Sequence, residues 1–362
     1  MNKKFNKEIF EMKLTIITAC VLRCDYCFVD KERPTFPMDW PTAKSALDFF
    51  LGSPGQVKIL KIYGGEPLLN WPLVEKLAIY ARRLAKKRGV ALTLSLCTNA
   101  ILLNEEQLRF FKKHNFMLAV SLDGGEAEHD RHRKFPDGAG SFSKVRQNLK
   151  KLFSFIPSQK IAVNMSVVPG AAGRVFKNFS DLLALGFETV NIEPVYGYQS
   201  WVGRQLASFE NSLGKIIEFI FKKTNEEKFY FLATINRDLK YKTLRRRREG
   251  VCFFRHGMDV YPDGRMGSSF LLNVVGSGHS AGNVVRGGVK KRYAACVFKN
   301  GSRRCRECFE DYYGFAKKER SSEAVLLRND LSIKAAQELE QAALMKPVFC
   351  RYILEAEKRV CF

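Results

Sequence analysis

The chain has 362 residues, of which 46% are hydrophobic, so it is long and apolar enough to bury a full barrel core and a second module. No apolar run approaches the roughly 18 residues that a membrane span requires, and no apolar signal segment opens the chain, which predicts a cytoplasmic protein with no membrane partner. With 60 Lys and Arg residues against 37 Asp and Glu, the formal net charge of +23 favours an acidic partner, either a peptide or a nucleic acid.

Strands and helices alternate along the first 195 residues. The expected strands are residues 13–18, 57–63, 92–96, 116–122, 160–168 and 188–193. The expected helices begin near Pro41, at Trp71, after an Asn104 cap, after a Ser141 cap and at Val175. This alternation implies parallel pairing through right-handed crossovers. Six units are too few for an eightfold barrel, so we expect an α/β fold with a partial (β/α)6 barrel over residues 1–200.

A cysteine triplet, Cys20, Cys24 and Cys27, occupies the loop after the first expected strand with C-x3-C-x2-C spacing. Three thiolates this close each bind one iron of a cubane cluster and leave the fourth iron without a protein ligand. A structural zinc site needs four ligands, usually as two separated pairs, and no fourth Cys or His stands beside the triplet. Ten cysteines in a cytoplasmic chain are also better explained as metal ligands or reduced thiols than as disulfides. The triplet therefore predicts a 4Fe-4S cluster with an open iron.

Three further motifs follow the ends of later expected strands: G-G-E-P-L-L at residues 64–69, T-N at residues 98–99 and S-L-D-G at residues 121–124. With the triplet, they resemble the radical S-adenosylmethionine (SAM) superfamily, and within it the anaerobic sulfatase-maturating enzymes and other SPASM or twitch peptide-modifying enzymes. The resemblance covers residues 13 to about 195. Because α/β barrels hold their active sites at the carboxyl ends of the strands, we expect the four motifs to converge on one rim.

The resemblance implies that SAM binds the open iron through its amino and carboxylate groups. Gly64 and Gly65 would then approach the methionyl group closely, and Glu66 would accept a hydrogen bond from its amino group. The alternative to SAM binding is a tight turn at the glycine pair and a capped strand end at Ser121. Six residues are expected to bind the cofactor: Tyr26 near the adenine, Gly64, Gly65 and Glu66 at the methionyl group, and Asn99 and Ser121 at the sugar or carboxylate.

A charged cluster, residues 128–133, follows the S-L-D-G motif. The stretch from His129 to Arg133 is similar to the H-D-x-x-R pattern of the sulfatase-maturase group, which implies that Arg133 holds a carboxylate of SAM or of the substrate. The alternative is a loop of surface ion pairs. Cys97, at the end of a strand, is expected to be a small core residue rather than a hydrogen-atom donor. Since the cofactor carries the radical chemistry, we name no catalytic residue.

Beyond the barrel, the sequence predicts a helical connector over residues 201–250 and then a hairpin that turns at Asp263-Gly264. The hairpin resembles the start of a twitch or SPASM module, here over residues 251–315, and a helical tail follows over residues 316–362. In that family a G-x4-C spacing follows the hairpin, but this chain has Ser269 at the corresponding position. We therefore expect a degenerate form of the module.

Four cysteines in this region are candidate ligands of an auxiliary cluster: Cys252, Cys296, Cys305 and Cys308. The last two form a C-x2-C pair, which is a metal-site spacing. One auxiliary 4Fe-4S cluster, a zinc site and a module without metal remain alternatives.

The resemblance implies reductive cleavage of SAM, with an external electron donor, to give a 5′-deoxyadenosyl radical that abstracts hydrogen from an unactivated C–H bond. We expect the target to be a peptide or protein, and the basic charge suits an acidic leader peptide. The alternatives are modification of RNA or a nucleotide, and a catalytically silent barrel that acts as a binding protein. The basic run at residues 242–248 is expected to be a solvated helix face or a mobile connector rather than a recognition patch, and no nucleic-acid module signature accompanies it. Against the RNA alternative, the G-G-E-P-L-L and S-L-D-G motifs look more like those of the peptide-modifying branch.

Overall fold

The computed structural model describes residues 8–27, 37–195, 198–241, 257–267, 282–285, 288–289 and 321–359. The chain divides into two compact units, each built from separate stretches. The first unit contains residues 1–23, 27–117 and 250–312, and the second contains residues 24–26, 118–249 and 313–362.

The sheet of the first unit has a parallel centre. Strand β2 (Val57–Tyr63) pairs in parallel with β1 (Glu11–Thr15) on one side and with β3 (Ala91–Thr98) on the other. Ile62 lies opposite Leu14 of β1 and Leu96 of β3, and all three side chains are fully buried. Apolar residues facing each other across parallel strands form the core that the sequence predicted here.

The predicted hairpin continues this sheet. Strand β8 (Gly257–Val260) pairs with β1 in parallel, which the sequence did not predict, and turns antiparallel into β9 (Arg265–Gly267). Gly264 has a φ of +79°, the left-handed conformation that favours glycine in such a turn. The short strands β10 (Gly282–Asn283) and β11 (Gly288–Val289) extend the antiparallel edge.

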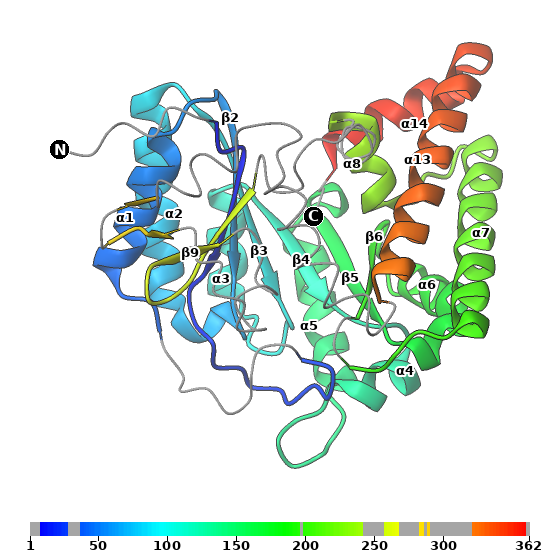
Figure 1. Cartoon of the computed structure of the whole chain (residues 1–362), viewed down its shortest axis with the longest axis horizontal. Coiled ribbons are helices and arrows are strands. Elements are labelled where there is room, and N and C mark those ends of the chain that lie inside the picture. Colours follow the sequence, from blue (N-terminus) through cyan, green and yellow to red (C-terminus); the bar gives the residue numbers. More distant parts are fainter. Residues whose placement is uncertain are drawn as a thin grey trace, which may run out of the picture. The chain divides into compact units, whose positions relative to one another are not determined.

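Among the described residues of the first unit, three helices and a short 3₁₀ turn accompany the strands: α1 (Trp40–Gly52), η1 (Pro67–Asn70), α2 (Trp71–Arg88) and α3 (Glu105–Lys113). Asp39 caps α1 by accepting a hydrogen bond from Thr42 N at 2.8 Å. Asn104 and Gln107 form a reciprocal capping box at the start of α3, which confirms the predicted Asn104 cap. Helices α1 and α2 pack against each other (Figure 1).

The second unit contains a parallel sheet in the order β4 (Phe116–Ser121), β5 (Ile161–Val167), β6 (Thr189–Pro194) and β7 (Phe231–Leu232). The strands are rich in buried apolar residues, as expected of parallel strands in an α/β fold. The predicted strands and the observed ones differ by at most three residues at either end.

Helices of the second unit are α4 (Glu126–His132), α5 (Phe142–Phe155), α6 (Val175–Ala184), α7 (Gly203–Asn225), α8 (Ala233–Tyr241), α13 (Ser321–Met345) and α14 (Pro347–Lys358), with 3₁₀ turns η2 (Ser158–Lys160) and η3 (Pro169–Arg174). Helices α13 and α14, orange to red in Figure 1, pack on α7 and α8. The ring of Tyr352 stacks on Phe231 with centroids 4.8 Å apart, so the C-terminal helices complete this core. None of the helices that the structure describes is long and apolar enough to cross a membrane.

Candidate functional site

The turn after β2 packs tightly on the segment that leads into Cys20. Gly65 N donates to Ile17 O at 2.9 Å, and Glu66 N donates to Ala19 O at 2.8 Å. A Cβ atom at Gly64 would lie 2.4 Å from Ile17 O, and one at Gly65 would lie 2.3 Å from Ala19 O. Both distances are far inside van der Waals contact, so a side chain at either position would displace the residues just before the first cysteine.

Glu66 is fully buried and joins two of the predicted motifs. Its Oε1 accepts hydrogen bonds from Thr98 Oγ1 at 2.8 Å and Leu68 N at 3.1 Å, and its Oε2 accepts from Asn99 N at 2.8 Å. Burial raises the pKa of Glu66 to about 7, and the three donors oppose that shift by stabilising the carboxylate. The G-G-E-P and T-N motifs are therefore parts of one hydrogen-bonded structure.

Asn99 connects this structure to Cys20. Its Oδ1 accepts from Ile101 N at 3.0 Å, and its Nδ2 donates to Cys20 Sγ at 3.5 Å. The same sulfur accepts from Leu22 N at 3.4 Å. Burial raises the pKa of the Cys20 thiol above its usual value, and these two N–H donors oppose the shift. Donors aimed at a sulfur are the groups that tune thiolates in iron-sulfur sites.

The three cysteines of the triplet are free thiols; Cys24 is buried, and Cys20 and Cys27 are half-buried. Within the described ranges, no group of three or more His, Cys, Asp or Glu side chains is arranged to hold a metal ion. Cluster binding by the triplet thus stays a prediction from its spacing. The predicted auxiliary ligands Cys252, Cys296, Cys305 and Cys308, and the position of Ser269, lie outside the described residues.

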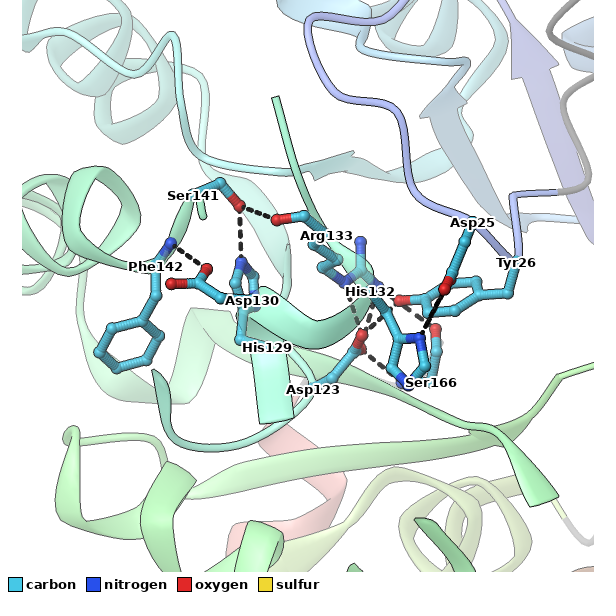
Figure 2. Close-up of polar contacts among 10 residues, drawn as sticks. All are labelled: Asp25, Tyr26, Asp123, His129, Asp130, His132, Arg133, Ser141, Phe142 and Ser166. Atoms are coloured by element: carbon cyan, nitrogen blue, oxygen red, sulfur yellow. Dashed lines mark hydrogen bonds and ion pairs between the residues drawn. The ribbon is translucent and has the colours of Figure 1, made fainter. Parts of the chain in front are cut away.

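In the second unit, Asp123 accepts four hydrogen bonds just beyond the end of β4 (Figure 2). Arg133 supplies two of them, from Nε to Oδ2 at 2.9 Å and from Nη2 to Oδ1 at 3.1 Å. Ser166 N donates to Oδ1 at 3.0 Å, and the hydroxyl of Tyr26 donates to Oδ2. Burial lowers the pKa of Arg133, but the adjacent Asp123 carboxylate outweighs this effect and holds it well above its usual value.

Tyr26 is enclosed by polar and aromatic side chains. The guanidinium of Arg133 lies 5.4 Å from its ring centre, and the imidazole of His132 lies 5.6 Å away, centre to centre. Burial raises the pKa of Tyr26 well above its usual value; the Arg133 charge opposes the shift and the Asp123 charge adds to it. The hydroxyl is therefore protonated and serves as a donor. The sequence predicted the position of Tyr26 in the triplet but not this anchor.

Helix α4 and its C-cap residue Arg133 carry the charged cluster, and several of its side chains are buried. His129, His132 and Arg133 expose only 0%, 7% and 8% of their surfaces. The alternative of a loop of surface ion pairs is wrong for these residues, because the segment folds as a helix whose inner face they occupy. The carboxylate that Arg133 holds here is that of the chain's own Asp123.

Two predicted positions differ in detail. Ser141 occupies the N-cap position of α5, but its hydroxyl donates to Arg133 O at 2.7 Å and does not cap the helix. Asp130 takes that role, because its Oδ1 accepts from Phe142 N at 2.8 Å. Cys97 is half-buried rather than a core residue. Ser121 is half-buried at the end of β4, opposite Asn164 of β5.

Comparison with known proteins adds family information to this geometry. Residues 14–191 match the family model of the radical SAM superfamily. A serine-type anaerobic sulfatase-maturating enzyme from Bacteroides thetaiotaomicron is 31% identical over 159 residues, which cover 41% of this chain and 37% of that enzyme. The chain thus spans well under half the length of this curated relative. A GTP 3′,8-cyclase from Thermodesulfovibrio yellowstonii is 24% identical over 247 residues, 64% of this chain and 73% of that protein.

The fold also has a counterpart among solved structures. Native anSMEcpe with bound AdoMet and Cp18Cys peptide aligns with 92% of this chain and 99% of its own, with a TM-score of 0.69 and 16% sequence identity. At this identity the likeness concerns the fold alone. It confirms the expected α/β fold with a partial (β/α)6 barrel, whereas the twitch or SPASM assignment of residues 251–315 stays a prediction.

Proposed function

Because residues 14–191 belong to the radical SAM superfamily, we propose that this chain is a radical SAM enzyme that modifies a peptide or protein after translation. The observation that carries the proposal is the connection between motifs. The G-G-E-P turn binds the backbone before Cys20, Glu66 binds the T-N turn, and Asn99 donates to the sulfur of Cys20. Motifs that are only weakly informative one by one are thus joined around the first cysteine.

The proposed cofactors are a 4Fe-4S cluster held by Cys20, Cys24 and Cys27, and SAM beside it. The donor set fits, because three free thiols lie within residues 20–27 and one of them already accepts two N–H hydrogen bonds. When bound, these groups supply the reductive cleavage of SAM, driven by an external electron donor, that yields a 5′-deoxyadenosyl radical.

The chain's own residues then bind and orient SAM. Glu66 accepts hydrogen bonds from Thr98, Leu68 and Asn99, which use three of the about four lone-pair sites of a carboxylate. We propose that the amino group of SAM takes the fourth. We propose that Gly64 and Gly65 approach the methionyl group, and that Asn99 and Ser121 bind its sugar or carboxylate. Tyr26, held by Asp123, is proposed to lie near the adenine.

A peptide substrate is supported by the relatives. The Bacteroides protein is named a sulfatase-maturating enzyme, and the solved anSMEcpe structure contains a peptide. The net charge of +23 suits an acidic peptide. The match to a GTP 3′,8-cyclase supports the second candidate, modification of a nucleotide.

Anaerobic reconstitution tests the proposal. The protein is loaded with iron and sulfide and incubated with SAM and dithionite, and 5′-deoxyadenosine is measured by mass spectrometry. We expect its formation by the wild type and not by a variant with Cys20, Cys24 and Cys27 changed to Ala. A loaded wild type that forms none overturns the enzyme assignment. Acidic peptides and nucleotides assayed in parallel, with the mass change of each as the readout, separate the two substrate classes.

A further inference from the structure

Two residues inside the cysteine triplet, Asp25 and Tyr26, are held by helix α4 and its partners (Figure 2). His132 Nδ1 lies 2.9 Å from Oδ2 and 3.1 Å from Oδ1 of Asp25. The backbone N–H of Asp25 also donates to His132 O at 3.2 Å. The hydroxyl of Tyr198 donates to Asp25 Oδ2 at 2.9 Å. Asp25 is thus fixed through both its backbone and its carboxylate.

Tyr26, the next residue, is fixed through a different contact. Its hydroxyl donates to Asp123, and the same carboxylate is held by two donors of Arg133 and by the backbone N–H of Ser166. Nη2 of Arg133 also donates to Ser166 Oγ at 3.2 Å. Arg133 therefore does not touch Tyr26 by a hydrogen bond but fixes the acceptor that Tyr26 binds.

Helix α4 is itself immobilised by contacts on its other side. Ser141 Oγ gives its hydrogen to Arg133 O, so His129 Nε2, 2.9 Å away, must be the donor in the His129–Ser141 contact. Asp130 caps helix α5 through Phe142 N at 2.8 Å. Glu128 forms two hydrogen bonds with Arg174, of which the shorter is 2.7 Å. The charged cluster thus ties α4 to its neighbours through Glu128, His129 and Asp130. It reaches the triplet through His132 and, by way of Asp123, through Arg133.

We propose that His132 and Arg133 are positioning residues that set the conformation of the backbone between Cys24 and Cys27 before any cofactor binds. His132 acts through Asp25, and Arg133 acts through Asp123 on Tyr26. The catalytic consequence of this arrangement rests on the proposed function, but the positioning is a property of the polypeptide and is measurable without iron or SAM.

The test compares variants that remove one contact each. His132→Phe keeps a ring of similar size and removes the contact with Asp25, and Tyr26→Phe removes the hydroxyl that binds Asp123. Arg131→Ala, an exposed residue on the same helix, is the matched control. His129→Gln is a second control, because it disturbs a buried histidine of α4 that binds Ser141 rather than the triplet.

Hydrogen–deuterium exchange of the metal-free protein is the first measurement. We expect peptides covering residues 20–27 to exchange about tenfold faster in H132F and Y26F, as the loss of one hydrogen bond to a charged group predicts. In R131A, residues 20–27 should exchange at the wild-type rate. In H129Q, the exchange rate of residues 20–27 should change no more than that of the rest of the second unit. Equal exchange of the segment in H132F, Y26F and R131A overturns the proposal.

Iron loading is the second measurement. Residues that orient metal ligands without binding the metal alter affinity by about 10- to 100-fold, so H132F is expected to need correspondingly more free iron for half-loading. The Arg133→Lys variant, which keeps the charge but donates less favourably to a carboxylate, should fall between H132F and the wild type. If wild-type protein neither loads iron nor binds SAM but the exchange pattern holds, the proposed function fails and the positioning stands. If H132F loads iron at the same free-iron concentration as the wild type, His132 does not position the cysteines for cluster binding, and that part of the proposal is overturned.

Discussion

Arg133 and Asp123 form a two-bond ion pair in which Nε and Nη2 lie 2.9 and 3.1 Å from the two carboxylate oxygens, with only 8% and 2% of the residues exposed. A pair this buried has lost its solvation, so its members depend on each other. Removing one member leaves the other as an uncompensated buried charge.

Replacing Arg133 by Met is therefore expected to lower the free energy of unfolding by about 3–5 kcal/mol. Denaturant titration of the metal-free protein measures the loss. Arg131→Met, on the exposed face of the same helix, should change stability by no more than about 0.5 kcal/mol. A similar result for both variants would mean that the pair contributes nothing beyond a surface ion pair.

Gly65 should not tolerate a side chain. In Gly65→Ala the new Cβ would lie 2.3 Å from Ala19 O, a backbone atom that cannot move aside without displacing the residues before Cys20. We expect a loss of about 1–3 kcal/mol in the free energy of unfolding and impaired iron loading. Gly214→Ala is the control, because no atom lies within 4 Å of a Cβ there and alanine favours the interior of α7. If Gly65→Ala unfolds with the same melting curve as the wild type, the packing argument is contradicted.

The buried imidazole of His129 should lower the free energy of unfolding at acidic pH. Burial lowers the pKa of His129 to about 3, while in the unfolded chain it is 6.5. Above pH 6.5 the imidazole is neutral in both states, and as the pH falls below this value only the unfolded chain gains a proton, until the folded pKa is reached. The resulting loss is about 2 kcal/mol between pH 6.5 and 5.

The measurement is the free energy of unfolding of metal-free wild type and His129→Gln over that pH range. The difference between the two proteins should shrink by this amount as the pH falls, because glutamine does not titrate. A constant difference would show that the histidine is protonated equally in both states. Glu66, whose folded pKa is raised to about 7, has the opposite sign and is present in both proteins, so it cancels in the comparison.

Iron content separates the alternatives for the C-terminal cysteines. About four irons per chain indicate the triplet cluster alone, and about eight indicate one auxiliary cluster as well. Changing Cys305 and Cys308 to Ala should halve the iron count only in the second case, while a zinc site would appear as roughly one zinc per chain that the double variant loses. An unchanged count of eight irons in the double variant rules out these two cysteines as ligands.

Local patterns in the sequence were enough for the six strands of the first 195 residues and for the resemblance to a family. The alternation of apolar strands with helices gave strand 57–63 with its observed bounds, and the Asn104 cap was recognisable because capping depends on residues three positions apart. The triplet and each of the strand-end motifs are also short stretches of neighbouring residues in the chain. Each of these features depends on spacing within a few residues.

What only the tertiary structure decided are the partners of the polar groups. Glu66 meets Thr98 across 32 positions, Tyr26 meets Asp123 across 97, and β8 joins β1 across more than 240. The spacing of residues in the sequence does not predict these contacts, since buried polar groups bind the donors and acceptors that lie beside them in the packed core. The sequence by itself therefore predicted the strands and the candidate cofactor-binding motifs. The fold decided that Arg133 holds Asp123 and that His132 holds Asp25, because such pairs exist only once distant strands and helices are packed together.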